Sequence, residues 1–414
     1  MRTVPDSRRQ KSVRHNQAEV LTCLVAGYVT GHTTLRRCVA WCRMQVRYLR
    51  KWMKLEYSIA SVSTVSRILS DIDEELFLYA FVEWAAQVLK TKGMHIAVDG
   101  KAIRAATEKQ KDTNTPMILN ALDTATSLVL AQLPMLSKEN EITAIPQLLK
   151  LLDLKENTVT IDAVGTQTGI MDQIHSQGGH FLLLVKKNQP AAYREITDMF
   201  RILDEDQKRI REGKEPVYPQ WADKYHSCRS HEKNRERYEY RFGCVCSDSS
   251  VLSRTNEDWI YVRSVGQIRQ TRILIVRDKQ GNDITPGLDQ FLKEGSRKQP
   301  LPTTGDRENC DNQIVGVISD MSITPEEMGK CKRDHWAVEN RLHHVLDDTF
   351  REDRSPAKKS KNNLALIRKY AYNLLRIAMI RLNWNRPMTE MIDRFNDDEN
   401  LLSSYLFKEI PAIC

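Results

Sequence analysis

The sequence predicts an α/β protein with a mixed five-stranded sheet and helices, preceded by a helical N-terminal domain and interrupted by a β-rich insertion. Apolar residues follow a helical spacing as far as about residue 90. Five short apolar runs follow between residues 95 and 185, and two of them end at an aspartate. Strand-like runs then extend to about residue 320, after which the helical spacing returns. A chain of 414 residues is long enough for two or three such domains.

The composition is that of a soluble globular protein, with 41% hydrophobic and 28% charged residues. No run approaches the roughly 20 apolar residues that span a bilayer, and the N-terminus has no apolar signal core. A cytoplasmic location is therefore expected. The nine cysteines are irregularly spaced, and neither Cys38 and Cys42 nor Cys244 and Cys246 has a partner pair at zinc-finger spacing. Buried thiols in a reducing compartment are favoured over a structural zinc.

The basic charge is concentrated at the N-terminus. Residues 1–56 hold twelve Lys or Arg against three acids, so a charge of +9 lies there and the remainder is near neutral. Basic and apolar side chains interleave in this segment, an arrangement that lets the cations bind phosphates while the apolar side chains pack a small core. This distribution favours a polyanionic partner such as DNA, and the alternative is an ordinary solvated helical face. The interleaved cations are Arg36, Arg37, Arg43, Arg47, Arg50, Lys51 and Lys54.

The first predicted elements are helices over residues 17–89. One begins around Ser61–Thr64 and continues to Ile72, and another covers Glu74 to Leu89. In the latter we expect a core-facing set consisting of Leu76, Tyr79, Phe81, Val82, Trp84 and Val88.

The sheet follows, with strands predicted at 95–98, 117–122, 127–133, 158–161 and 181–185. The second and third form a hairpin, and helices are expected over about 142–152 and 166–177. A meander followed by crossover units is the order that an RNase H-like sheet requires.

After Pro190 a charged helix is predicted over 191–215, then strands at 238–246, 259–265, 272–277 and 313–318, and a mobile polar segment at 294–312. Thr324, Pro325 and Glu327 form a helix-start signal, and longer helices follow over about 334–350 and 362–382. The predicted domains are an N-terminal DNA-binding domain (1–90), the first part of the core (91–190), the insertion (191–320), the C-terminal helices of the core (321–385) and a tail (386–414).

Three acids are candidates for catalysis. Asp99 and Asp162 each follow a predicted strand of one sheet, and Glu339 lies among apolar residues of a later helix, where an unpaired acid is costly. Carboxylate oxygens in an open site favour Mg²⁺ or Mn²⁺. Two such ions would activate a nucleophile and stabilise the leaving oxygen in phosphodiester cleavage and strand transfer. The alternative is that the aspartates only cap a turn or a helix.

Several further motifs, which follow one another along the chain, add to this evidence for a catalytic site. They are Asp99-Gly100-Lys101 with Ile103 and Arg104; Asp162-Ala163-Val164-Gly165-Thr166-Gln167; Val185-Lys186-Lys187-Asn188-Gln189-Pro190; His335-Trp336-Ala337-Val338-Glu339-Asn340; and Leu342-His343, Leu346-Asp347, Phe350, Glu352 and Asp353. Over residues 15–385 the chain resembles the H-repeat-associated (ISAs-type) branch of the DDE insertion-sequence transposases.

The resemblance implies that Asp99, Asp162 and Glu339 form a metal-binding catalytic triad for two Mg²⁺ or Mn²⁺ ions. It also implies double-stranded DNA, as element ends and target, for a partner, a homodimer or higher synaptic assembly, and a place beside the bacterial nucleoid. The DNA-contacting residues that we expect on this basis are Lys101, Arg104, Lys186, Lys187, Asn188, Gln189, His231, Arg235, Arg237, His335 and Asn340. For the two lysines at 186 and 187, a solvated strand end is the alternative.

The sequence departs from the wider transposase class at several positions. Lys332, His335 and Leu346 stand where that class often has Tyr, Arg and a basic residue. Asp320, His344 and Asp348 also differ from the usual pattern. His335 and His343 are expected in structural or DNA-contacting roles, since imidazole is not what two-metal phosphoryl transfer needs. A decayed copy that only binds DNA and an RNase H-like nuclease without strand transfer therefore stay open as alternatives.

Overall fold

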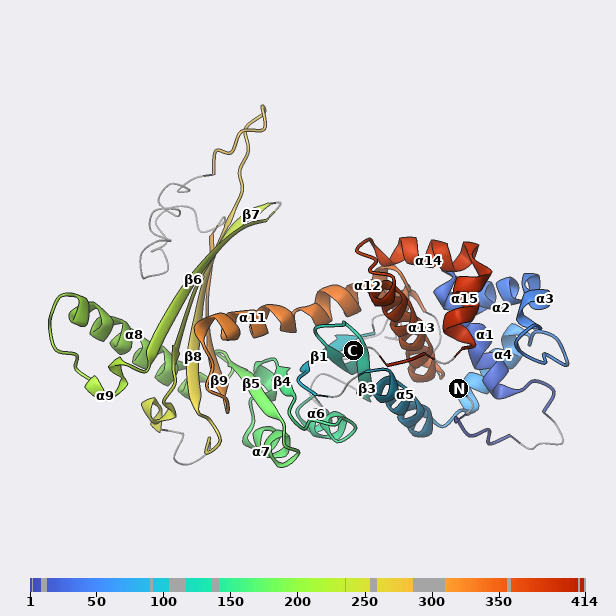
Figure 1. The fold of residues 1–414 in the computed structure, drawn as a ribbon, viewed down its shortest axis with the longest axis horizontal. Helices are drawn as coiled ribbons and strands as arrows, with labels where there is room; N and C mark the ends of the chain where they lie inside the picture. Colours follow the sequence, from blue (N-terminus) through green and yellow to red (C-terminus); the bar gives the residue numbers. More distant parts are fainter. Residues whose placement is uncertain are drawn as a thin grey trace, which may run out of the picture. The chain divides into compact units, whose positions relative to one another are not determined.

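The computed structural model describes residues 1–414 except 2, 9–12, 90–91, 104–116, 136–140, 235, 254–258, 286–309, 356–358, 409 and 413–414. The chain divides into two compact units (Figure 1). The first unit consists of Met1–Asn157 and His335–Cys414, and the second consists of Thr158–Asp334. The predicted insertion, residues 191–320, lies wholly within the second unit.

The first unit begins with the predicted helices, and four of them start at a side chain that accepts a backbone N–H. Asn16, Thr34, Ser61 and Asp73 cap α1, α2, α4 and α5 in this way, as short polar residues at this position are expected to do. The helices are α1 (Gln17–Val29), α2 (Leu35–Met44), α3 (Val46–Leu49), α4 (Val62–Asp71) and α5 (Glu74–Val88).

The buried face of α5 differs from the prediction. Phe81 and Val88 are buried as expected, but Leu76 and Tyr79 are each 45% exposed. The face that packs is formed instead by Phe77, Leu78, Phe81, Ala85 and Val88. Apolar residues occur on both faces of this helix, so their spacing in the sequence does not show which face is buried.

The meander of the first unit is confirmed. It contains β1 (His95–Ala102), β2 (Met117–Asp123) and β3 (Val129–Met135), with β1 antiparallel to β2 and β2 antiparallel to β3. The first strand is longer than predicted, since it runs three residues past Asp99. Asp99 therefore lies within β1, opposite Asn120 of β2, and not at its end.

The core of the first unit is built around α13 (Lys361–Arg381), a helix that is buried along most of its length. It packs against α1, α5 and β3, which come from distant parts of the sequence. The other helices of this unit are α6 (Glu141–Leu149), a π-helical segment (Val338–His343), α12 (His344–Asp348), α14 (Met388–Asp397) and α15 (Glu399–Leu406).

The second unit contains a parallel pair extended by antiparallel strands. β4 (Thr158–Ile161) and β5 (His180–Val185) are parallel and joined by α7 (Thr168–Ser176), which is the predicted crossover unit. Beyond them the strand order is β5-β9-β8-β7-β6, all antiparallel. The added strands are β6 (Tyr225–Asn234), β7 (Arg237–Cys246), β8 (Ser264–Leu274) and β9 (Cys310–Ser319).

Helices cover both faces of this extended sheet. Ile196 of α8 (Pro190–Arg211) lies against Gly316 on one face, and Met328 of α11 (Pro325–His335) lies against Gly243 and Gly266 on the other. The short α9 (Pro219–Ala222) follows α8 (Figure 1). The start of α11 is the predicted capping box, since the side chains of Thr324 and Glu327 each accept the other residue's backbone N–H.

The insertion strands were only partly predicted. The strand expected at 259–265 is wrong, because β8 begins at Ser264 and continues into the run predicted separately at 272–277, where it ends at Leu274. The strand β6 was not predicted at all. Of the segment 294–312, residues 294–309 lie outside the described residues.

The prediction of buried thiols is confirmed for Cys38, Cys42, Cys244 and Cys246. Burial raises the pKa of Cys38 to about 12, so this thiol stays protonated at neutral pH. In the part of the chain that the structure describes, no helix combines the length and apolarity that crossing a membrane requires.

Candidate active site

Asp99 lies in the middle of β1, and its side chain is 21% exposed. The strand positions it because the flanking residues Ile96, Ala97 and Val98 are fully buried. Asp99 and Asn120 are direct partners across the β1–β2 ladder, so their side chains leave the sheet on the same face. The carboxylate thus occupies a fixed place on a rigid sheet and remains open to solvent.

A buried histidine lies between these two side chains. The Nδ1 atom of His343 is 3.7 Å from Oδ2 of Asp99, and its Nε2 atom is 3.2 Å from Nδ2 of Asn120. An amide Nδ2 can only donate, so Nε2 of the imidazole accepts and its proton lies on Nδ1, facing Asp99. Burial, with Lys101 and Lys369 adding to it, lowers the pKa of His343 to about 3. The imidazole is therefore neutral, and its Nδ1–H faces the Asp99 carboxylate.

Glu339 lies four residues before His343 in the π-helical segment Val338–His343. This segment packs against β1, and its inward side chains Val338 and Leu342 are fully buried. Glu339 itself is exposed. The sequence predicted this acid among apolar neighbours, where an unpaired charge is costly, but its side chain is exposed, so burial does not require it to have a partner. Isolated π-helical turns recur at functional sites because they shift the direction of the side chains that follow.

Lys101 lies two residues after Asp99 and belongs to a buried ion-pair cluster. Its Nζ atom is 2.6 Å from Asp347, 3.0 Å from Glu352 and 3.5 Å from Asp353. The lysine side chain is only 5% exposed. This arrangement favours a structural role for Lys101 over the expected DNA contact.

The centre of this cluster is Glu352, which is almost fully buried. Burial raises the pKa of the Glu352 carboxyl, but Lys369, Lys101 and Arg368 together outweigh burial and lower it to about 2. Nζ of Lys369 also donates to Gln132 of β3 at 2.6 Å. The cluster therefore links the segment after α12 to α13 and to the meander that holds Asp99.

In the second unit, Asp162 directly follows β4, as predicted. Nζ of Lys186, which follows β5, lies 2.5 Å from Oδ1 of Asp162. Both side chains are more than 40% exposed. Asp162 occupies the N-cap position of a short 3₁₀ turn, Ala163–Gly165, without making the side-chain cap bond that the alternative reading requires.

Side-chain bonds join the loops after β4 and β5. Asn188 Nδ2 donates to the carbonyl of Ala163 at 3.3 Å, and Gln189 Nε2 donates to the carbonyl of Thr166. Thr166 Oγ1 donates to the carbonyl of Leu184 at 2.6 Å. Because parallel strands end at one edge of a sheet, this network holds Asp162 and Lys186 at that edge.

The remaining residues that we expected to contact DNA lie in different surroundings. His231 and Arg237 project from opposite faces of the β6–β7 hairpin, since their register partners are Tyr240 and Asn234. Arg104 and Arg235 lie outside the described residues. His335 is buried, whereas Lys187 and Asn340 are exposed.

The basic side chains of the N-terminal helical region point to solvent. All seven cations between Arg36 and Lys54 are exposed, whereas Cys38, Val39, Trp41, Cys42 and Leu49 are buried among them. The predicted division into a cationic surface and an apolar core is therefore present.

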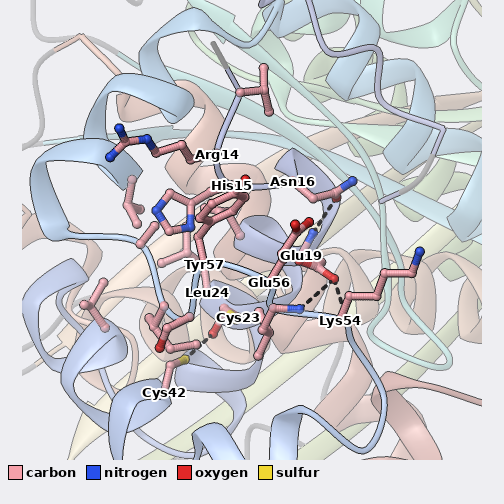
Figure 2. Close-up of a pocket in the computed structure, with 18 of the residues that line it drawn as sticks. Arg14, His15, Asn16, Glu19, Cys23, Leu24, Cys42, Lys54, Glu56 and Tyr57 are labelled. Atoms are coloured by element: carbon pink, nitrogen blue, oxygen red, sulfur yellow. Dashed lines mark hydrogen bonds between the residues drawn. The ribbon is translucent and has the colours of Figure 1, made fainter. Parts of the chain in front are cut away.

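A cavity of about 330 Å³ lies beneath this region, between α1, α2 and the loop 54–60 (Figure 2). Glu19 closes one side by accepting the backbone N–H groups of Lys54 and Leu55. The Sγ atom of Cys42 donates to the carbonyl of Cys23 at its floor. None of the three candidate catalytic acids lines it, and of the interleaved cations only Lys54 does.

The departures from the wider class have structural explanations. Leu346 is fully buried, so a basic residue there would lie in the core. The carboxylate of Asp320 accepts hydrogen bonds from Nδ1 of His180 at 3.0 Å and from the backbone N–H of Phe181 at 2.7 Å. These two bonds hold the end of β9 to β5. His344 and Asp348 are exposed on their helix and disturb no packing.

The roles of two residues at this site were not expected from the sequence. Asn120 could have been found only from the register of β1 and β2, which no short motif encodes. Glu352 belonged to a recognised motif, but its partners Lys101, Arg368 and Lys369 are far apart in the chain. In both cases the role of the residue depends on a tertiary contact.

Two protein-family models match this chain. A family model described as "Transposase DDE domain" matches residues 90–374, and one described as "DDE_Tnp_1-associated" matches residues 1–85. The chain is similar to a putative transposase YncI of Escherichia coli O157:H7, with 28% identity over 90% of this chain and 85% of the relative.

It is also similar to an H repeat-associated putative transposase YhhI of Escherichia coli K12, with 26% identity over 84% of this chain and 82% of the relative. A solved structure titled as a piggyBac transposase synaptic complex with hairpin DNA aligns with a TM-score of 0.38 and 11% identity. That alignment covers 97% of this chain and 75% of the other. The matched family model spans all three acids and most of the chain, so this protein belongs to the transposase DDE domain family, as the resemblance to H-repeat-associated transposases indicated.

Proposed function

We propose that this protein is a metal-dependent DNA transposase that cleaves DNA at the ends of an insertion sequence and joins the freed 3′-ends to a target. The observation that carries this proposal is the position of the acids within the matched family region. Asp99 lies on a rigid strand, Asp162 follows a parallel strand, and Glu339 lies on a helical segment packed against the strand of Asp99.

We further propose that Asp99, Asp162 and Glu339 are the ligands of two Mg²⁺ or Mn²⁺ ions. The donor set consists of hard carboxylate oxygens only, which suits these ions, and all three side chains reach solvent. Among the described residues, no three His, Cys, Asp or Glu side chains gather closely enough to hold an ion. When bound, the ions would activate the attacking oxygen and stabilise the leaving oxygen.

The chain's own side chains have supporting roles in this proposal. Asn120 fixes the His343 imidazole, whose Nδ1 atom faces the Asp99 carboxylate at 3.7 Å. Lys186 holds Asp162 through a charge-assisted contact. The Lys101–Glu352 cluster anchors β1 on the same face of the strand as Asp99. The proposed core is RNase H-like, supported by the antiparallel meander β1–β3 and the parallel unit β4–α7–β5.

We propose double-stranded DNA as the partner. The exposed arginines of α2 and α3 supply a sequence-independent phosphate-binding surface. Asn340 follows Glu339 in the sequence, and Lys187 follows Lys186, which pairs with Asp162. Both residues are exposed and are proposed to contact the same DNA. A synaptic homodimer or higher assembly on DNA is proposed because two ends must be joined together.

The test uses end-labelled DNA from the flanks of the gene, incubated with the full-length protein with and without Mg²⁺. We expect cleavage at the element ends that depends on the metal ion. Glu339→Gln, which preserves the shape of the side chain and removes its charge, should abolish cleavage and leave DNA binding intact.

The matched control is Glu83→Gln, the same change at an exposed position of α5, which should leave cleavage unaffected. Binding without cleavage by the unmodified protein would indicate a decayed copy that only binds DNA. Cleavage that persists in Glu339→Gln would remove this residue from the catalytic set.

A further inference from the structure

The face of the extended sheet beneath α11 contains a buried cluster of cations around one carboxylate. Arg237, Glu239 and Arg241 alternate along β7, so they project from the same face, and Arg272 of β8 lies opposite Glu239 in register. Lys332 of α11 completes the group, and we call these five residues the Glu239 cluster. It lies within the second unit and contains none of the three proposed catalytic acids.

The contacts within the cluster are centred on Glu239, which is fully buried. Arg237 and Arg241 form ion pairs with its carboxylate, and Nε of Arg272 lies 3.5 Å from its Oε1 atom. Arg241 also pairs with Glu232 at 2.9 Å, near the edge of the cluster. A single buried carboxylate thus serves three guanidinium groups.

Lys332 is a buried cation without such a partner. It lies one turn after Met328, which contacts Gly243 and Gly266 of the sheet, so it projects toward the same face. Only 8% of the residue is exposed, and among the described residues its Nζ atom has no hydrogen-bond partner. Burial, followed by repulsion from Arg241, Arg272 and Lys186, outweighs Glu239 and lowers the pKa of Lys332 to about 8.

The described side chains therefore leave the cluster with an excess of positive charge. Lys332 adds a buried positive charge to a group in which Arg237 and Arg241 already share the carboxylates of Glu239 and Glu232. A buried cation without a counter-charge is costly, and an anion that binds there removes the cost. The Arg237 side chain is 41% exposed, so the cluster is accessible to a ligand. Guanidinium groups and an ammonium together suit a phosphate oxyanion.

We propose that the Glu239 cluster binds a phosphate group of the DNA backbone, with Lys332 and Arg241 as its principal ligands. This inference rests on the proposed function, since DNA is the source of phosphate that a transposase meets. A free phosphate ion has the same chemistry and is distinguished below. Under this proposal the β-rich insertion is itself a DNA-binding element, and its contact does not depend on base sequence.

The test measures the binding of a short mixed-sequence DNA duplex to full-length protein across a range of salt concentrations, without divalent metal. Lys332→Met keeps the length of the side chain and removes its charge. Losing one phosphate contact should lower the slope of log K against log salt by about 1 and weaken binding roughly tenfold at about 0.1 M salt. Lys332→Arg should bind DNA like the unmodified protein.

The control is Lys330→Met, which removes the same charge from an exposed position of the same helix. This variant should retain the salt dependence. Thermal unfolding separates binding from folding, because removing an uncompensated buried cation should leave the Tm of the free Lys332→Met protein unchanged or raised. A purely structural lysine would instead lower it.

Unchanged DNA affinity in Lys332→Met would overturn the inference while leaving the proposed function in place. Weaker binding with a lowered Tm and an unaltered salt slope would also overturn it. If the unmodified protein binds no duplex, the proposed function fails and this inference fails with it.

Acylation of Lys332 by an amine reagent distinguishes the two phosphate sources. Protection by duplex, and not by inorganic phosphate at equal phosphate concentration, supports the backbone assignment. Equal protection by inorganic phosphate would overturn that assignment.

Discussion

At the scale of single residues, the best-defined feature of the site is the neutral imidazole of His343 between Asp99 and Asn120. Groups that orient a metal-binding carboxylate contribute to activity without touching the substrate. We expect His343→Asn to lower DNA cleavage by roughly 10- to 100-fold and to raise the metal concentration needed for half-maximal activity. Cleavage assays over a Mg²⁺ titration measure both quantities.

His344→Asn provides the comparison, because the next residue is exposed and receives the same substitution. It should leave the metal titration unaltered. Equal effects of the two substitutions would contradict a specific positioning role for His343.

We expect Glu352 to contribute to the stability of the fold more than to catalysis. Removing its charge leaves Lys101, Arg368 and Lys369 without their shared counter-charge, so Glu352→Gln should lower the free energy of unfolding by about 3–5 kcal/mol at neutral pH. The pKa of Glu352 is about 2 in the folded protein and about 4.3 in an unfolded chain.

The sign of the pH dependence follows from this lowered pKa. The stabilisation is complete above about pH 4.3 and is lost as the pH falls toward 2. Urea unfolding of both proteins at a series of pH values should therefore show curves that converge in acid. A stability difference that is independent of pH would show that the ionised carboxylate is not responsible.

The same residues show how much of the site can be predicted from sequence. Asp162 could be placed at a strand end because a short apolar run stops there. Lys101 could not be separated from DNA-contacting lysines, because its burial depends on Asp347 and Glu352 more than 240 residues away. Charge type is visible in a sequence, but the partner that neutralises it is not.

At the scale of elements, α1 and α2 pack at a close contact that requires glycine. A Cβ atom added at Gly27 would lie 2.7 Å from Cβ and 3.0 Å from Cα of Cys38. Backbone must move to relieve this contact, so Gly27→Ala should destabilise the protein by about 1–3 kcal/mol. Thermal unfolding measures the change.

The matched substitution is Gly169→Ala in α7, where an added Cβ atom meets nothing within 4 Å. Alanine favours a helix over glycine, so this variant should be neutral or more stable by up to about 1 kcal/mol. Destabilisation of both variants to the same extent would show that the α1–α2 contact is not the cause.

Elements with strong local signals were the ones that the sequence predicted. The capping box at Thr324 and Glu327 located the start of α11 to the residue. By contrast, β6 (Tyr225–Asn234) has few apolar residues, because it is the edge strand of the described sheet and pairs there with β7. The extension of β1 past Asp99 depends on pairing with β2, and it replaces the apparent strand end at Asp99–Gly100.

At the scale of the whole molecule, the order of segments agrees with the function proposed. A basic helical region precedes the strands and helices that hold the acids, and an insertion with its own cationic cluster separates the second acid from the third. The order was predictable because each segment has a distinct composition. The fold of the insertion was not, since β6, β7 and β8 depend on one another for pairing.

The measurement that tests the central claim most directly is strand transfer. Duplex DNA with a pre-cut element end is incubated with full-length protein, Mg²⁺ and a supercoiled target plasmid, and joined products are separated by size. We expect joining that requires both the metal ion and a free 3′-hydroxyl and that is lost in Glu339→Gln. Cleavage of the uncut end without any joining to target would contradict the claim and identify the protein as a nuclease on the same fold.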